Sequence, residues 1–456
     1  MDTEEIEQVR EAVDALSRAL GEERFRHVAG LSPAPELAGI FEAHAVAAHR
    51  DVVAMLREAG EQDLAARVAG LAAERAAAPA EESWRAADAV ATGNGPDGVV
   101  GLPDAALGLL HERDRDRRGA LGRAVTEGAR ASSAPREAAA EARAAARASL
   151  GLTPAWEDVV QADEFLAVSD GAYRELLAWF ARQEGLELPP RGDLDRTGLL
   201  HLLAFRDQDG LFRPAPLSPV VLEGFDGLGI DVRRVRLDGA ARAAKWPGAH
   251  AFDGRVSLRR QGGLSDWLDL PDAAGRAAAA ATSRPSTRDP ALGATVGALG
   301  SWLLLEPRFL ESATGQDRRR SRDVIRRLAL RLLFQLRARA AALRVAVEVE
   351  RGLGGKAWHE AHREALSLAA AVSWPGGLAA RDADAEAHRT ALAGAAWAAG
   401  IRNDLRERFD EDYWRNPRTG EALAGRLAAG SPGPERERPP LARAAEALGE
   451  LLEAGK

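Results

Sequence analysis

Apolar residues recur every three or four positions along most of the 456-residue chain, which is the spacing of helices with one buried face. The clearest stripe lies between Asp323 and Gly352 and predicts a long buried helix that stops near that glycine. Its apolar face comprises Ile325, Leu328, Leu332, Leu336, Leu343 and Val347. Similar stripes predict helices over residues 3–20, 36–58, 61–77 and 134–149.

The two-residue alternation that is typical of strands is scarce. The strongest candidate is HAFDGRVSLRR (250–260), where Asp253 and Gly254 predict a hairpin turn and Val256 and Leu258 alternate after it. A shorter strand pair is expected around DGVVGLP (97–103). Because no fixed-period repeat accompanies these segments, the pattern predicts a mostly α protein with a small β insertion.

Composition narrows the class of protein. The chain is 46% hydrophobic and 29% charged, as in folded globular proteins, and its formal net charge is -8. A modest charge of mixed sign argues against nucleic acid or an anionic membrane as a partner. The absence of cysteine excludes disulfides and thiolate zinc sites. An acidic N-terminus that does not resemble a signal peptide, and no run of about 18 apolar residues, lead us to expect a cytoplasmic protein.

Several segments, in one order along the chain, are similar to segments of a known enzyme family. They are HERDRDRRGAL (111–121), LPPRGDLDRTGLLHLLAFRDQDGLF (188–212), VVLEGFDGLGIDV (220–232), HAFDGRVSLRRQGGLSDW (250–267) and FDEDYWRNPRTGEALAGRL (409–427). Together they resemble the thimet oligopeptidase / oligoendopeptidase F family of zinc metallopeptidases over roughly residues 100 to 430. The resemblance implies a bilobed, zincin-like, mostly α fold, with a small antiparallel β element beside the zinc helix.

The resemblance also suggests how the chain is divided. Residues 1–100 are expected to form an N-terminal helical region, and residues 101–430 the bilobed peptidase-like region. Residues 431–456 would follow as a segment rich in proline and charge that ends in a helix. The former zinc helix would lie at about 264–282.

The chemistry of that family requires a helix with the motif His-Glu-x-x-His, and the resemblance aligns it with the stretch DAAGRA (272–277). Asp272 and Arg276 then stand where the two histidine ligands would be, and Ala273 stands where the catalytic glutamate would be. Val296, in GATVGALGSWLLLEPRFLE (293–311), stands where the third ligand would be. Gly275 keeps the small residue of the family.

These replacements remove the chemistry at each position. Arginine is permanently cationic and cannot ligate zinc, and alanine cannot act as a general base. Valine has no donor for a metal ion. We therefore expect a catalytically inactive metallopeptidase homologue with no zinc and no other cofactor. Pro271 is a further departure, because a proline is expected to kink or restart the helix there.

A simpler interpretation of DAAGRA is an ordinary helix start with an ion pair between Asp272 and Arg276 at i, i+4. A second alternative is a metal-dependent peptidase or hydrolase with a relocated site. Its ligands would come from WHEAHREA (358–365) and a later helix, namely His359, Glu360, His362 and His388. A third is a purely structural component with a collapsed cleft.

Tryptophan is frequent, with ten Trp against two Tyr. Trp246, Trp267 and Trp302 would lie near the former cleft by the resemblance, where they could contact a ligand; the alternative is that they fill the core. We expect the protein to bind a peptide or a partner protein, without nucleic acid or membrane. The oligomeric state does not follow from the sequence.

Overall fold

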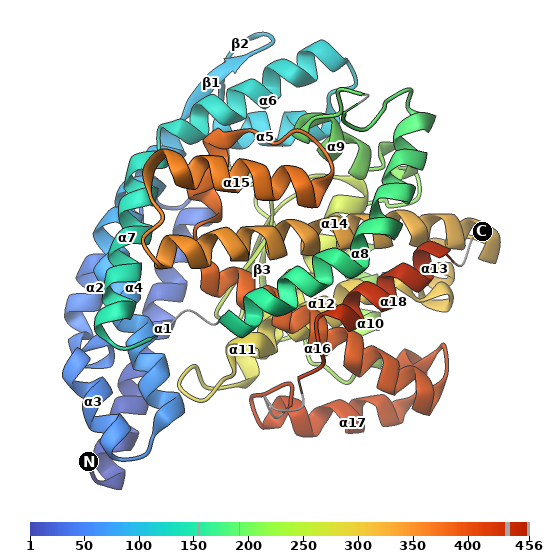
Figure 1. The fold of residues 1–456 in the computed structure, drawn as a ribbon. Helices are drawn as coiled ribbons and strands as arrows, with labels where there is room; N and C mark the ends of the chain where they lie inside the picture. Colours follow the sequence, from blue (N-terminus) through green and yellow to red (C-terminus); the bar gives the residue numbers. More distant parts are fainter. Residues whose placement is uncertain (153–155, 191, 434–437, 454–456) are drawn as a thin grey trace.

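The computed structural model describes residues 1–456 except 153–155, 191, 434–437 and 454–456. The N-terminal helices lie together on one side of the molecule, in blue in Figure 1. They are α1 (Thr3–Val28), α2 (Leu37–Ala43), η1 (Ala45–Ala48), α3 (Arg50–Glu58) and α4 (Gln62–Val90). A capping box between Asp2 and Glu5 begins α1, as expected where an acidic residue meets the unpaired N–H groups of a first turn.

A hairpin and three helices follow. They are β1 (Thr92–Gly95), β2 (Gly98–Gly101), α5 (Leu102–His111), α6 (Arg115–Arg130) and α7 (Ser133–Ser149). The strands β1 and β2 pair antiparallel, so the strand pair expected around residues 97–103 is confirmed. The helix α7 returns along α4 and joins the N-terminal group (Figure 1).

The remaining helices follow along the chain from residue 156. The first of them are α8 (Trp156–Gln183), α9 (Arg196–Leu203), η2 (Arg206–Gln208), α10 (Leu217–Gly227), α11 (Gly263–Thr282), α12 (Pro290–Trp302), η3 (Leu303–Leu305) and α13 (Pro307–Thr314). The last are α14 (Arg318–Glu350), α15 (Gly355–Ala370), η4 (Gly376–Asp382), α16 (Ala385–Phe409), η5 (Tyr413–Arg415), α17 (Pro417–Ala428) and α18 (Ala442–Glu453). The long helix α14 crosses the middle of the molecule between α15 and α8 (Figure 1).

The long helix confirms the clearest pattern in the sequence. All six residues of the predicted apolar face are buried, and Gly352 adopts φ 107 just beyond the end of α14. The helix expected over 36–58 is wrong as one unit, because the chain breaks between α2 and α3. The Nδ1 atom of His49 accepts a hydrogen bond from the backbone N–H of Asp51 at 3.3 Å, so a new helix begins there.

A three-stranded sheet carries the second expected hairpin. The strands are β3 (Arg236–Asp238), β4 (Gly248–Phe252) and β5 (Arg255–Arg259), in the order β3-β5-β4. The strands β4 and β5 pair antiparallel through a two-residue turn in which Asp253 and Gly254 both have positive φ. That geometry confirms the turn predicted from the sequence. The third strand, β3, was not predicted, and it pairs parallel to β5.

The inner face of the sheet rests on α11, and its outer face meets α1. Val256 and Leu258 belong to the main hydrophobic cluster, whereas Phe252 packs edge-on against Phe25 of α1 with ring centroids 6.4 Å apart. The antiparallel element therefore lies beside α11, as the fold prediction required.

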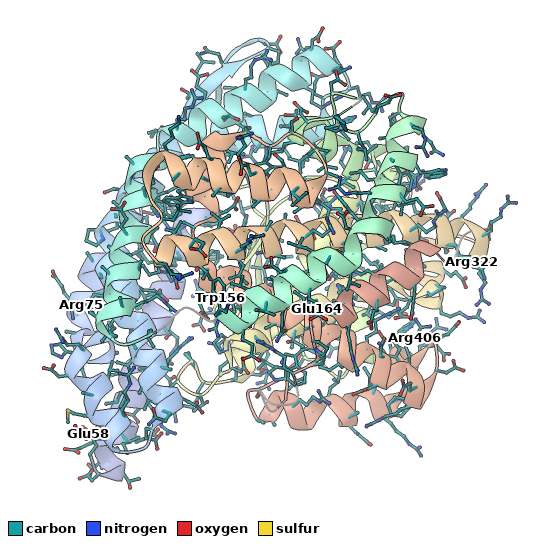
Figure 2. The ribbon with its side chains drawn as sticks, in the orientation of Figure 1. Glu58, Arg75, Trp156, Glu164, Arg322 and Arg406 are labelled. Carbon is teal, nitrogen blue, oxygen red and sulfur yellow. The ribbon has the colours of Figure 1, made fainter. Side chains whose placement is uncertain are left out.

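One large hydrophobic cluster runs from α8 to α18, and it includes Leu448 and Leu452 near the C-terminus. A second cluster is built from residues 9 to 78, within the N-terminal helices. The division of the chain at residues 100 and 430 stays a prediction. Charged side chains such as Glu58, Arg75 and Arg322 project from the surface of the molecule (Figure 2). Among the described residues, no helix is both long and apolar enough to cross a membrane.

Candidate functional site

The helix α11 holds the stretch that the resemblance aligns with a zinc helix. It runs without interruption from Gly263 to Thr282, with Pro271 inside it. The expected restart at Pro271 is therefore wrong. A proline removes one backbone N–H from the helical ladder, but the buried face of α11 on both sides of it holds the helix in place. Asp272 thus lies in the middle of α11 and not in its first turn.

The backbones of α11 and α12 approach each other very closely at two glycines. A Cβ atom on Gly275 would lie 2.6 Å from the carbonyl oxygen of Val296, and one on Gly297 would lie 2.6 Å from that of Asp272. These distances are too short for any side chain. The position where a third ligand was expected therefore lies directly against α11, but the Val296 side chain there is 1% exposed and part of the core.

Asp272 and Arg276 form the ion pair expected from their spacing. The Nε atom of Arg276 donates to Oδ2 of Asp272 at 2.7 Å, and both side chains are about one-third exposed. The attraction of Asp272 raises the pKa of Arg276, so the guanidinium is firmly charged. A cation in hydrogen-bond contact with the only carboxylate at these positions does not fit a zinc site, because it repels the metal and occupies the donor.

Three further charged residues join this pair. Asp269 lies one helical turn before Asp272 on α11, and Arg331 and Arg339 come from α14. We call Asp269, Asp272, Arg276, Arg331 and Arg339 the α11 charge cluster. The charges of Asp272 and Arg276 both act electrostatically on Arg339. The guanidinium of Arg339 makes no hydrogen bond or ion pair with a described residue.

Asp269 is the most perturbed acid of the cluster. Burial raises its pKa to about 6, and the negative charges of Asp272 and Asp266 add to the rise, against the opposing effect of Arg331. Its Oδ2 atom accepts a hydrogen bond from Nε2 of Gln261 at 2.7 Å. The side chain is partly accessible to solvent although protein atoms surround it on most sides.

The edge strand β4 begins beside this cluster. A Cβ atom on Gly248 would lie 2.8 Å from Nε2 of Gln261 and 3.4 Å from Oδ2 of Asp269. In the sheet order β3-β5-β4, the strand β4 has a neighbour on one side only. One row of its backbone N–H and C=O groups is therefore not used by this sheet.

The histidines of the alternative site engage separate partners. His359 contacts two acceptors, the carbonyl of Gly376 and the carboxylate of Glu137, each at 3.0 Å. Both ring nitrogens of His359 are thus engaged by oxygen atoms of the protein. Glu360 lies on the exposed side of α15, 3.5 Å from Lys356.

His362 and His388 meet instead at Asp382. The Nε2 atom of His362 donates to Oδ2 of Asp382 at 2.9 Å, and that of His388 donates to the Asp382 carbonyl at 3.1 Å. Although burial opposes ionisation, the bond from His362 lowers the pKa of Asp382. Burial lowers the pKa of His388. Among the described residues, no group of three or more His, Asp or Glu side chains is placed to hold a metal ion. The four residues of the alternative site are thus not brought together as a ligand set.

The tryptophans have mostly packing roles. Trp267 and Trp302 are 1% and 3% exposed and belong to the main cluster, and the indole N–H of Trp267 donates to the carbonyl of Arg213 at 3.0 Å. Trp246 is partly buried against the cluster beneath β1 and β2. We therefore assign no ligand contact to Trp267 or Trp302.

Asp269, Arg331, Arg339 and Asp382 were not singled out from the sequence. Asp269 could have been found, because a residue three positions before Asp272 shares its helical face. The arginines lie eight residues apart on one long helix, but nothing in the local pattern shows that α14 passes α11. Asp382 contacts a histidine 20 residues away, which spacing alone does not reveal.

No family model matches the chain, and no curated protein matches it. Among solved structures, an oligoendopeptidase F is similar with a TM-score of 0.59 at 15% identity, covering 94% of this chain and 85% of its own. PZ peptidase A, solved with an inhibitor, has a TM-score of 0.58 at 14% identity and coverages of 93% and 82%. Metallocarboxypeptidase 1 of Trypanosoma cruzi has a TM-score of 0.52 at 14% identity and covers 98% of both chains.

At these identities the similarity shows the fold alone. The mostly helical, zincin-like metallopeptidase fold expected from the resemblance is confirmed. The structural neighbours are metallopeptidases, and the chain spans most of their length.

Proposed function

We propose that this protein is an inactive relative of these metallopeptidases that binds a peptide, or an extended segment of a partner protein, along β4 without cleaving it. The observation that carries the proposal is the position of the edge strand β4 beside the α11 charge cluster. An extended peptide that adds to a sheet edge gains main-chain hydrogen bonds, and neighbouring side chains then select its sequence.

Three features support binding without hydrolysis. Ala273 cannot take a proton from water, Arg276 holds the carboxylate of Asp272, and the buried Val296 has no donor. The residues present thus do not fit a zinc ion of the type that the fold family uses.

The cluster also suggests which peptides are preferred. Asp272 and Arg276 neutralise each other, and Arg331 faces Asp269. Arg339 has no such partner, since its guanidinium makes no ion pair with a described residue. We therefore infer a preference for peptides with an acidic side chain near the point where α14 passes α11.

The test is a binding and cleavage assay with the full chain. Fluorescent peptides of acidic, neutral and basic composition are titrated against the protein, and the same mixtures are examined by mass spectrometry with added zinc, cobalt or manganese. We expect saturable binding of acidic peptides and intact peptides after incubation. Arg339→Ala should weaken binding roughly three- to tenfold.

The matched control is Arg344→Ala on the same helix, because Arg344 is exposed and pairs with Asp163 at 3.6 Å away from the cluster. It should leave peptide affinity unchanged. Metal-dependent cleavage, or equal effects of the two substitutions, would contradict the proposal. Failure of every peptide pool to bind would favour a purely structural role.

A further inference from the structure

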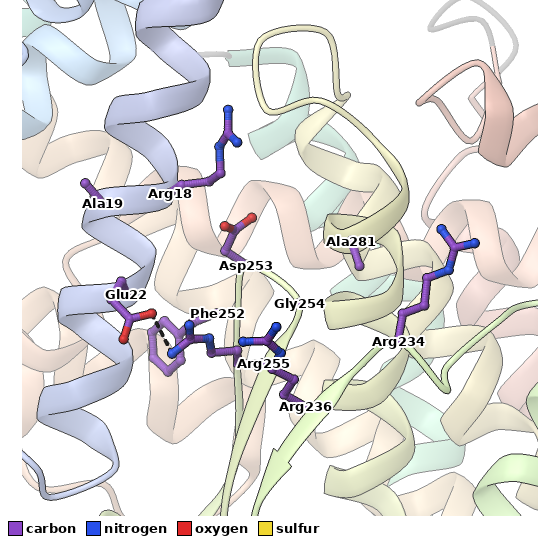
Figure 3. Close-up of a pocket in the computed structure, with 10 residues that line it drawn as sticks. All are labelled: Arg18, Ala19, Glu22, Arg234, Arg236, Phe252, Asp253, Gly254, Arg255 and Ala281. Atoms are coloured by element: carbon purple, nitrogen blue, oxygen red, sulfur yellow. Dashed lines mark ion pairs between the residues drawn. The ribbon is translucent and has the colours of Figure 1, made fainter.

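A pocket lies where α1, the β4–β5 turn and the end of α11 meet (Figure 3). Its volume is about 470 Å³, within the range of small-molecule sites. A neighbouring hollow of about 720 Å³ shares Arg18, Asp253 and Ala281 with it. The pocket lies beyond the α11 charge cluster, because Ala281 follows Arg276 by more than one turn of the helix.

Four arginines line this pocket, against two acids. Figure 3 shows Arg18 and Glu22 on α1 at one side of the pocket, Glu22 pointing to Arg255 of the hairpin, and Arg234 on the opposite side beside Ala281. Glu22 is engaged, because its Oε2 lies 2.5 Å from Nη1 of Arg255. Arg234 is paired with Asp231 at 3.2 Å. The remaining arginines are Arg18 and Arg236.

These two arginines have no ion-pair partner among the residues that the structure describes. Arg18 donates its Nε–H to the neutral backbone carbonyl of Asp14 at 3.0 Å, which leaves its terminal N–H groups available. The side chain of Arg236 makes no hydrogen bond or ion pair with a described residue. Its backbone N–H donates to the carbonyl of Gly254 within the sheet. Both side chains are exposed to solvent at the pocket.

We propose that this pocket binds a small phosphate-bearing molecule through Arg18 and Arg236. Guanidinium groups match the geometry of phosphate oxygens and remain charged throughout the physiological range. The rest of the lining includes the ring of Phe252 and the methyl groups of Ala19 and Ala281, which suit an apolar substituent on the phosphate. The class of ligand is therefore a phosphate monoester with an apolar part.

The side chain of Asp253, the second acid of the pocket, makes no hydrogen bond or ion pair with a described residue, and its charge repels an anion. It occupies the first turn position at φ 37, a conformation that asparagine tolerates as well as aspartate does. The substitution Asp253→Asn therefore removes the charge and keeps the hairpin. It should tighten phosphate binding about threefold, and the gain should shrink at high salt.

The experiment is calorimetric titration of the full chain with inorganic phosphate, phenyl phosphate and, as the carboxylate arm, benzoate. We expect phenyl phosphate to bind more tightly than phosphate, and benzoate to bind most weakly. Arg18→Ala and Arg236→Ala should each lower the affinity for phenyl phosphate about tenfold. Because both side chains are exposed, the melting temperature should stay unchanged and confirm an intact fold.

The control is Arg233→Ala, three residues before Arg236, since Arg233 is exposed and pairs with Asp226 outside the pocket. It should leave the affinity unaltered. The proposal is overturned if no phosphate compound binds saturably, if Arg233→Ala weakens binding as much as Arg236→Ala, or if benzoate binds as tightly as phenyl phosphate. None of these readouts depends on peptide binding at β4.

Discussion

The substitution Gly275→Ala tests how tightly α11 is held against α12. A new Cβ atom would lie 2.6 Å from the carbonyl oxygen of Val296 and 2.8 Å from the backbone nitrogen of Gly297. Both contacts are with backbone atoms, so no side-chain rotation can relieve them. The two helices must move apart, and the buried residues around Val296 must repack.

Two opposing effects set the magnitude. Alanine is favoured over glycine inside a helix by about 1 kcal/mol, which stabilises the variant. Overpacking of a closed core costs about 1–3 kcal/mol, and contacts with backbone atoms of α12 place this site at the upper end of that range. We therefore expect Gly275→Ala to lower the free energy of unfolding by about 2 kcal/mol.

Gly171→Ala on α8 is the matched control, because a Cβ atom there would have nothing within 4 Å. Only the helix propensity then changes, and the variant should be more stable by about 0.5–1 kcal/mol. Urea denaturation followed by circular dichroism measures both variants, with midpoints compared at a common slope. A Gly275→Ala protein that is as stable as the parent would refute the close approach of α11 and α12.

Three other predictions address the charged groups. Because burial raises the pKa of Asp269 from 3.8 to about 6, the folded state binds more protons than the unfolded state in that window, so stability falls as the pH rises through it. Asp269→Asn should reduce the dependence of stability on pH, measured by urea denaturation from pH 4 to 7, and should raise the free energy of unfolding by about 1–2 kcal/mol at pH 7. An unchanged pH dependence would contradict the raised pKa of Asp269. The double variant Asp272→His with Ala273→Glu should gain neither stoichiometric zinc by elemental analysis nor peptidase activity, because two ligand positions stay unsuited, and zinc-dependent turnover would show that the ligands are misplaced. Glu306→Ala should destabilise the protein by about 3–5 kcal/mol in thermal unfolding, because it leaves the buried Arg402 without the carboxylate that now lies 2.5 Å from its Nε atom. A loss below about 1 kcal/mol would contradict a stabilising role of that pair.

Local sequence determined much of the architecture. The stripe of α14 and the stop near Gly352 follow from a period that any buried helix must keep. The turn at Asp253 and Gly254 follows from the positive φ that both positions need. The ion pair between Asp272 and Arg276 follows from a spacing of four on one helix. Each of these features is fixed by residues close together in the chain.

The candidate site depended on more than local pattern. The sequence identified α11 and the substitutions at residues 272, 273, 276 and 296 only through resemblance, because a short motif without its chemistry carries no signal of its own. Of the kink or restart expected at Pro271, the restart is wrong, because the buried face of α11 holds one continuous helix there.

Only the tertiary structure decided which distant groups meet. It placed Arg339 beside α11, directed His359 to Glu137 and His362 to Asp382, and brought Arg18 of α1 and Arg236 of β3 to the lining of one pocket. The physical reason is that periodicity, turn chemistry and helix pairing act over a few residues, whereas these contacts join segments tens to hundreds of residues apart. Their geometry is set by how whole helices pack, and no short stretch of sequence records it.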